Sequence, residues 1–159
     1  MRTEPTPEHR WLQQLVGEWT YENECDMGPE GPTEKGKGRE IVRAFGDLWV
    51  MGEMIGTAPG AGEMRGMMTL GYDPARGRFI GTWIGTPIAH MFVYKGVLVG
   101  DVLTLDCEGP AFDDPSRVAV YQDIIELRSP RERVLRSQVQ DDEGVWREFM
   151  RGEFTRSEP

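Results

Sequence analysis

The chain has 159 residues and a formal net charge of -9, from 27 acidic and 18 basic residues. Nucleic acids and anionic membranes bind concentrated basic faces. The basic residues here are scattered, so we expect neither partner. No apolar run reaches the roughly 18 residues of a membrane span, and the first residues lack the apolar segment of a secretory signal. We therefore expect a cytoplasmic protein.

The first predicted element is a short helix over residues 6–16. Pro7 suits its first turn, and its apolar face is formed by Trp11, Leu12, Leu15 and Val16. A helix of about two or three turns is not stable alone, so it must dock on the rest of the chain. We expect Trp19 to be buried against it and His9, on its first turn, to be exposed.

Strands separated by turns are predicted for the rest of the chain. The first, at 18–25, alternates, with Trp19, Tyr21 and Cys25 on one face and acidic residues on the other. Further strands are predicted at 38–45, 48–57, 64–72, 78–85, 90–94, 97–107, 117–127, 133–140 and 145–155. Turn residues (Gly, Pro, Asp and Ser) separate them, including loops at 28–32 and 58–62.

About ten antiparallel strands with short connections leave two open edges unless the sheet closes, and barrel closure is the common solution. We predict one all-β domain over residues 1–159, a closed antiparallel barrel over 17–156 with a short N-terminal helix; a two-sheet sandwich is the alternative. Glycines inside the strand runs favour strongly bent strands. They are Gly52, Gly56, Gly66, Gly71, Gly81 and Gly85.

Two motifs carry a family resemblance. The helix followed by Gly17-Glu18-Trp19 is similar to the helix–Gly-x-Trp–strand start of lipocalins and the wider calycin superfamily. The stretch GYDPARGRFIGTW at 71–83 resembles the signature of the bacterial DUF1579 family, and MFVYKG at 91–96 is similar to it as well. The resemblance runs from about His9 to Arg156 and implies a lipocalin-like barrel, with no established activity.

Few catalytic chemistries fit this sequence. Its 2 histidines cannot supply a three-histidine metal site, and we find no metal-binding Cys or His spacing, phosphate-binding glycine loop or Gly-x-Ser-x-Gly elbow. No metal site is predicted, the cofactor is unknown, and catalysis stays an open question. We expect Cys25 and Cys107 to be reduced thiols, with a disulfide between them as the alternative.

A few polar residues lie within apolar strands. His90 shares a strand face with Phe92 and Tyr94, which makes it a candidate hydrogen-bond donor, general base or haem ligand. Burying a charge is costly unless the charge is paired, and Glu53 and Arg65 are the charged residues that we most readily place inside. Outward positions are expected for Arg43, Asp123 and Glu148.

Two classes of function fit these observations. The favoured one is a binding module whose barrel encloses a small hydrophobic or aromatic molecule among methionine and aromatic side chains. The predicted ligand-binding residues are Trp19, Tyr21, Glu53, Arg65, Trp83, His90, Phe92 and Tyr94. The rival is an enzyme or haem protein that uses His90 with an interior carboxylate such as Glu53. A structural or interaction domain with a filled barrel is a further alternative, and homodimer formation is left open.

Overall fold

The computed structural model describes residues 1–26, 31, 33–58 and 62–157, so the loops predicted at 28–32 and 58–62 lie mostly outside the described residues. Its elements are α1 (Pro7–Gln13), β1 (Gly17–Asp26), β2 (Thr33–Phe45), β3 (Trp49–Ala58), β4 (Gly62–Asp73), β5 (Arg78–Gly85), β6 (Ile88–Val99), β7 (Val102–Pro110), β8 (Val118–Ser129), β9 (Glu132–Gln140) and β10 (Trp146–Arg156). No described helix is long and apolar enough to cross a bilayer.

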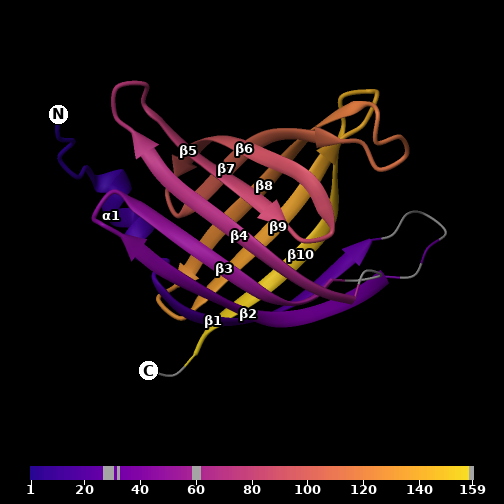
Figure 1. Cartoon of the computed structure of the whole chain (residues 1–159), viewed down its shortest axis with the longest axis horizontal. Coiled ribbons are helices and arrows are strands. Elements are labelled where there is room, and N and C mark those ends of the chain that lie inside the picture. The colour runs from indigo at the N-terminus through magenta and orange to yellow at the C-terminus, as the bar shows by residue number, and fades with distance from the viewer. Residues whose placement is uncertain (27–30, 32, 59–61, 158–159) are drawn as a thin grey trace.

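The described strands form one closed antiparallel barrel. Each strand pairs with its neighbours in the chain, and β1 closes the ring by pairing with β10 (Figure 1). The closing register joins Trp19 to Arg156 and Tyr21 to Phe154. The predicted closed barrel with a short N-terminal helix is therefore confirmed, and the sandwich alternative is wrong.

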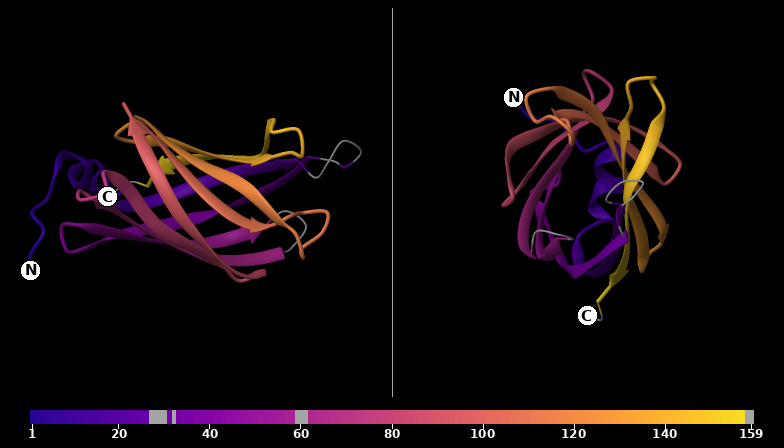
Figure 2. Two further views of the ribbon diagram at one scale, coloured as in Figure 1. Left: turned by 90° about the horizontal axis from the view of Figure 1, so that it is seen from above. Right: turned by 90° about the vertical axis from the view of Figure 1, so that its right-hand side faces the viewer.

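The helix α1 lies across one end of the barrel, where it is visible behind the ring of strands when the molecule is viewed from the other end (Figure 2). Leu12 and Leu15 are 0% and 1% exposed, and Trp19 beneath them is 0% exposed. The Trp19 indole donates a hydrogen bond to the Leu15 carbonyl at 2.9 Å. This confirms that Trp19 is buried against the helical segment, and it makes this the closed end of the barrel.

The helix is shorter than predicted, and the expected exposure of His9 on its first turn is wrong. The chain leaves α-helical geometry after Gln13 in a tighter turn, in which the Val16 amide donates to the Gln13 carbonyl at 3.2 Å. His9, which we expected to be exposed, is only 1% exposed. Its Nδ1 accepts from the Thr6 amide at 2.9 Å, so its Nε2 carries the proton and donates to the Tyr72 carbonyl at 3.0 Å. His9 therefore fixes the helix start onto β4.

Arg156, the last residue of β10, also joins the helical segment to the barrel. Its guanidinium donates to the Val16 carbonyl at 2.6 Å and to the Gln14 carbonyl at 2.8 Å. Carbonyls at the end of a helix have no partner within the helix itself. The same guanidinium lies 4.3 Å from the centroid of the Trp19 ring, a cation–π arrangement. Arg156 thus connects the end of β10 to the helical segment and to Trp19 of β1.

One strand boundary differs from the prediction. We expected a break between strands at 95–96 and turn residues at Val99-Gly100-Asp101. The structure has only the second, because β6 runs unbroken from Ile88 to Val99 and the turn to β7 falls at Gly100 and Asp101. Gly100 has φ +62°, a left-handed conformation that glycine adopts at little cost. Gly96 serves a different purpose, since a Cβ there would lie 2.7 Å from the Leu105 side chain. It allows close packing within the sheet.

Candidate functional site

The inward side chains in the two halves of the barrel differ in how deeply they are buried. Near the closed end, the inward side chains of Val50, Leu70 and Leu103 are all 0% exposed. Toward the open end, inward side chains are only partly buried although the barrel surrounds them. We call this partly exposed half of the interior the lumen; its inward residues include Met64, Trp83, Phe92, Asp123, Leu135 and Val139.

Glycines on the inner wall give the lumen aromatics room to lie against the sheet. A Cβ at Gly66 would lie 2.9 Å from the Trp83 ring, and a Cβ at Gly85 would lie closer still. Phe92 covers Gly109 in the same way. Because side chains larger than hydrogen would push these rings off the wall, the glycines hold the lumen open at the level of Trp83 and Phe92.

Aromatic side chains continue from the lumen to the rim of the barrel. The Phe92 ring lies 6.0 Å from Trp83 and 6.1 Å from Tyr121, centroid to centroid. Phe112, in the β7–β8 connection, lies 5.8 Å from Tyr121 and 5.0 Å from Phe149, and these two pairs meet edge to face. Such pairs stabilise one another beyond their buried area. Phe112 is nevertheless 70% exposed, so the aromatic wall reaches solvent.

Below the aromatic rings lies a polar group built on Asp123. Its two carboxylate oxygens accept hydrogen bonds from the Tyr94 hydroxyl at 2.5 Å and the Ser137 hydroxyl at 2.6 Å. Burial raises the pKa of Asp123, and these two hydrogen bonds act in the opposite direction. We expected Asp123 to face outward; that expectation is wrong, because Asp123 shares the inward face of β8 with Tyr121 and Ile125.

A buried ion pair separates this polar group from the closed end. Arg133 on β9 donates to Glu40 on β2, and the two side chains are 3% and 4% exposed. The Arg133 guanidinium lies 4.7 Å from the Trp19 centroid and 4.0 Å from that of Phe154. Burial lowers the pKa of Arg133, although the Glu40 carboxylate opposes that shift. This pair is charged, paired and inaccessible to a ligand.

Glu53 and Arg65 are not inside the barrel. They lie on the outer faces of β3 and β4 and form an ion pair there, with side chains 34% and 62% exposed. Their inward neighbours are Met54 on β3 and Gly66 on β4. The expectation of an inward Glu53 and Arg65 is therefore wrong, since solvent on the outer wall stabilises both charges without burial.

His90 lies at a seam in the barrel wall. The paired register of β6 and β7 ends at Lys95 and Asp106 in the described part of both strands. Further toward the open end, His90 Nε2 lies 3.0 Å from the Glu108 carbonyl, to which it donates. Its ring also meets Phe92 edge-on at 4.7 Å. An imidazole thus joins the two strands where their backbones are no longer paired.

A hollow of about 550 Å³ lies beside this seam. It is lined by residues of the β5–β6 turn, the end of β7 and the β7–β8 connection, among them Ile88, His90, Pro110 and Arg117. His90 therefore lines this hollow and also contacts Phe92 of the lumen. It is partly exposed at the rim and makes no contact with an interior carboxylate among the described residues.

The remaining predicted site residues lie deeper. Trp19 is enclosed at the closed end and Tyr94 is 3% exposed beside Asp123. Tyr21 is 2% exposed and stacks on Phe154 at 5.0 Å. Its hydroxyl faces Gly38 of β2 and has no hydrogen-bond partner among the described residues. Of the predicted set, the structure brings Trp83, Phe92 and His90 together at the open end.

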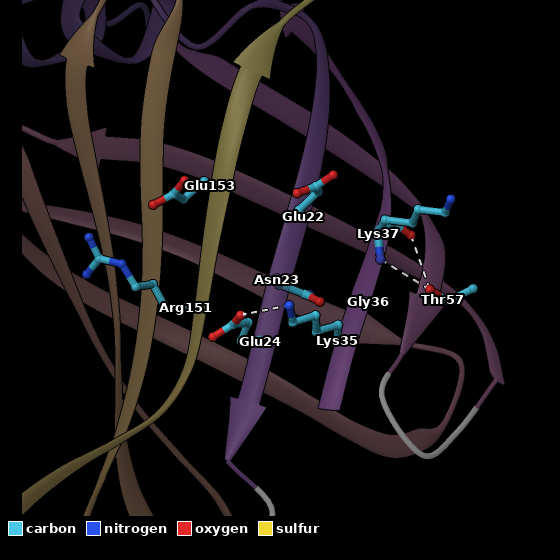
Figure 3. Close-up of a pocket in the computed structure, with 9 residues that line it drawn as sticks. All are labelled: Glu22, Asn23, Glu24, Lys35, Gly36, Lys37, Thr57, Arg151 and Glu153. Atoms are coloured by element: carbon cyan, nitrogen blue, oxygen red, sulfur yellow. Dashed lines mark hydrogen bonds and ion pairs between the residues drawn. The ribbon is translucent and has the colours of Figure 1, made fainter. Parts of the chain in front are cut away.

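A second hollow, of about 680 Å³, lies on the outer wall across β10, β1, β2 and β3 (Figure 3). Both signs of charge line it, and Glu24 pairs with Lys35 at 3.7 Å. Thr57 links β3 to the Lys37 backbone at 3.2 Å. Exposed pairs of this kind contribute little and are screened by salt, so this hollow offers no selective charge.

Neither cysteines nor acidic groups build a metal centre in the described part of the chain. Cys25 and Cys107 are not joined by a disulfide in the structure. Cys107 points inward beside Asp123, and burial together with the charges of Asp123 and Asp106 raises the pKa of its thiol to about 12. Such a thiol is protonated and unreactive at neutral pH.

Sequence reasoning missed four inward positions that carry polar groups: Tyr121, Ser137, Glu40 and Arg133. Strand alternation indicates two of them. Tyr121 lies on the same strand face as the buried Ile125, and Glu40 lies on the same face as the buried Val42. No local signal identifies Arg133, whose neighbour Val134 is equally buried although it faces outward.

Known proteins support the barrel and assign its family. The family model "Protein of unknown function (DUF1579)" matches residues 4–156. The crystal structure of Rv2717c from M. tuberculosis superposes with a TM-score of 0.64 at 15% identity, covering 98% of this chain and 100% of that one. The S-type phycobiliprotein lyase CPES from Guillardia theta gives a TM-score of 0.61 at 12% identity, with coverages of 97% and 94%.

At these identities the structural likeness shows the fold alone. Among curated proteins, no match is found. The family model spans nearly the whole chain, including helix α1 and all ten strands, and it agrees with the resemblance carried by residues 71–83. The chain belongs to the DUF1579 family.

Proposed function

We propose that this protein is a cytoplasmic binding barrel whose lumen takes up a flat aromatic or apolar small molecule. One observation carries the proposal: inward side chains near the closed end are 0% exposed, whereas Trp83 and Phe92 stay partly exposed inside the same ring of strands. Apolar walls with a few placed polar groups are typical of small-molecule sites. The two free thiols suit a reducing compartment.

The structure gives less support to the rival functions. An enzyme or haem protein was expected to pair His90 with an interior carboxylate, but Glu53 lies on the outer wall and His90 donates to a backbone carbonyl. A filled barrel was the other alternative, and the partly exposed side chains of the lumen argue against it. The binding barrel is therefore the function that the geometry favours.

Titration with N-phenyl-1-naphthylamine, a neutral probe that fluoresces in apolar surroundings, tests the proposal. We expect saturable binding to the native protein, with the near-UV circular dichroism unchanged, because a loosened state would also take up the dye. Replacing Trp83 by leucine removes one aromatic wall. Since an aromatic pair contributes about 0.5–1.5 kcal/mol, the affinity should fall roughly 2- to 12-fold.

Trp49 provides a matched control. It covers Gly71 on the outer wall much as Trp83 covers Gly66 in the lumen, and it is 38% exposed near the closed end. Trp49→Leu should leave the affinity for the probe unchanged. The proposal fails if the folded protein gives no saturable signal, or if Trp49→Leu weakens binding as much as Trp83→Leu does.

A further inference from the structure

The lumen holds one ionisable group whose arrangement points to a class of ligand. Asp123 projects inward from β8, one inward position deeper than Tyr121. Its carboxylate accepts one hydrogen bond on each oxygen, from Tyr94 and from Ser137. A carboxylate has about four lone-pair sites, so acceptor capacity remains. The residue as a whole is only partly buried.

The inward charges are distributed unequally along the barrel. Near the closed end, Glu40 is paired with Arg133, and Arg156 is held by backbone carbonyls. In the open half, two acidic residues lie at inward-facing strand positions: Asp123 in the lumen and Glu34 on β2 at the rim of the barrel. Arg147 on β10 is in register with Val139 at the rim of this half, but its side chain is 67% exposed and donates to Asp141 at 2.8 Å. The lumen is therefore a partly apolar space with an excess of negative charge.

We infer that the lumen selects ligands that present a hydrogen-bond donor, above all a protonated amine, to Asp123; this inference rests on the proposed function. A donor in the lumen meets free acceptor sites, and a cation adds a charge-assisted bond in surroundings of low dielectric. A carboxylate ligand meets the like charge of Asp123, which has no cationic partner among the described residues. The aromatic wall of Trp83, Phe92 and Tyr121 suits the flat part of the same molecule, and its rings also attract cations.

The raised pKa of Asp123 fits a buried carboxylate that has no cationic partner in the described part of the chain. Burial raises its pKa, and hydrogen bonds from Ser137 and Tyr94 only partly compensate. The same carboxylate contributes to raising the pKa of Tyr94 and of Cys107, both beside it. No cation among the described residues pairs with Asp123, and a bound ammonium group would supply the missing counter-charge.

Three naphthalene derivatives that differ in one group test the selection. 2-Naphthylmethylamine, 2-naphthylmethanol and 2-naphthoate are used at pH 7.5 to displace N-phenyl-1-naphthylamine from the protein. We expect the amine to bind tightest and the carboxylate weakest, with at least about tenfold between them, as one charge-assisted hydrogen bond can supply. In Asp123→Asn, the amine should lose at least about fivefold and approach the alcohol.

Asp106→Asn is the control, because Asp106 is an exposed carboxylate on the outer face of β7 that accepts from Gln122 at 2.7 Å. It should leave the order of the three ligands unchanged. If Asp123→Asn fails to fold, Tyr94→Phe serves instead: it keeps the carboxylate and frees an acceptor site, so the preference for the amine should persist or grow. Equal affinities for amine and carboxylate overturn this inference and leave the binding barrel standing, whereas absence of probe binding refutes the proposed function itself.

Discussion

Replacing Arg133 by methionine tests whether the interior ion pair depends on both partners. Methionine keeps an unbranched chain but leaves the Glu40 carboxylate buried without its counter-ion. Removing one partner of a buried pair costs about 3–5 kcal/mol. That is a large share of the roughly 5–15 kcal/mol that stabilises a typical domain. For a chain of this length, it corresponds to a fall in melting temperature of about 6–20 °C.

The double variant Arg133→Met/Glu40→Met separates the cost of an unpaired charge from the worth of the pair. Apolar replacements of a buried pair are often neutral, so most of the lost stability should return, to within about 2 kcal/mol of the original protein. Arg65→Met is the matched control: it breaks an Arg–Glu pair on the outer wall, where one side chain is 62% exposed. Its cost should be at most about 1 kcal/mol.

Urea unfolding followed by tryptophan fluorescence and far-UV circular dichroism measures all three variants. Coincident transitions with equal m-values permit comparison of the free energies. A loss below about 1 kcal/mol for Arg133→Met would refute the argument, since it would mean that Glu40 finds water or another partner. The argument also fails if the double variant is as unstable as the single one.

Two further outcomes follow from buried groups. Tyr21→Phe removes a hydroxyl that has no partner among the described residues and keeps the ring stacked on Phe154; unfolding in urea should show no loss of stability beyond about 0.5 kcal/mol, and a larger loss would mean that the hydroxyl has a partner. Cys107, with a pKa of about 12, should react with a thiol reagent at pH 8 at least about 100-fold more slowly in the native Cys25→Ser variant than in urea. Rapid native reaction would show that the Cys107 thiol is accessible as a thiolate.

The strands and their closure could be predicted because turn residues and alternation are local properties. Trp19 and Tyr21 alternate with acidic residues along β1, and each run is bounded by glycine, proline or aspartate. The break expected at 95–96 was wrong because a glycine in a strand and a glycine in a turn are identical in sequence. Only the packing of Leu105 against Gly96 and the positive φ of Gly100 distinguish them.

The candidate site was harder to predict because glycines occupy so many inward positions. Along β3 the inward Gly52 alternates with Met51 and Glu53 on the outer face, so an apolar residue faces outward while the inward position carries no side chain. Strand alternation therefore does not indicate whether Glu53 faces inward or outward. The polar group at Asp123 depends on strands that meet only in the folded barrel, where Ser137 lies opposite it in register. Local sequence cannot supply that pairing.

The pairing of β1 with β10 has a consequence for how the chain folds. Arg156 and the Val16 carbonyl that it binds are 140 positions apart in sequence, and contacts of such separation form slowly because a long loop must close first. During synthesis Trp19 and the edge of β1 emerge early, while their partners on β10 emerge last. Until then β1 and β9 both present unpaired edges, the kind that promote aggregation. The barrel is completed only when its last strand arrives, so the folding nucleus must form elsewhere, among hairpins that close locally.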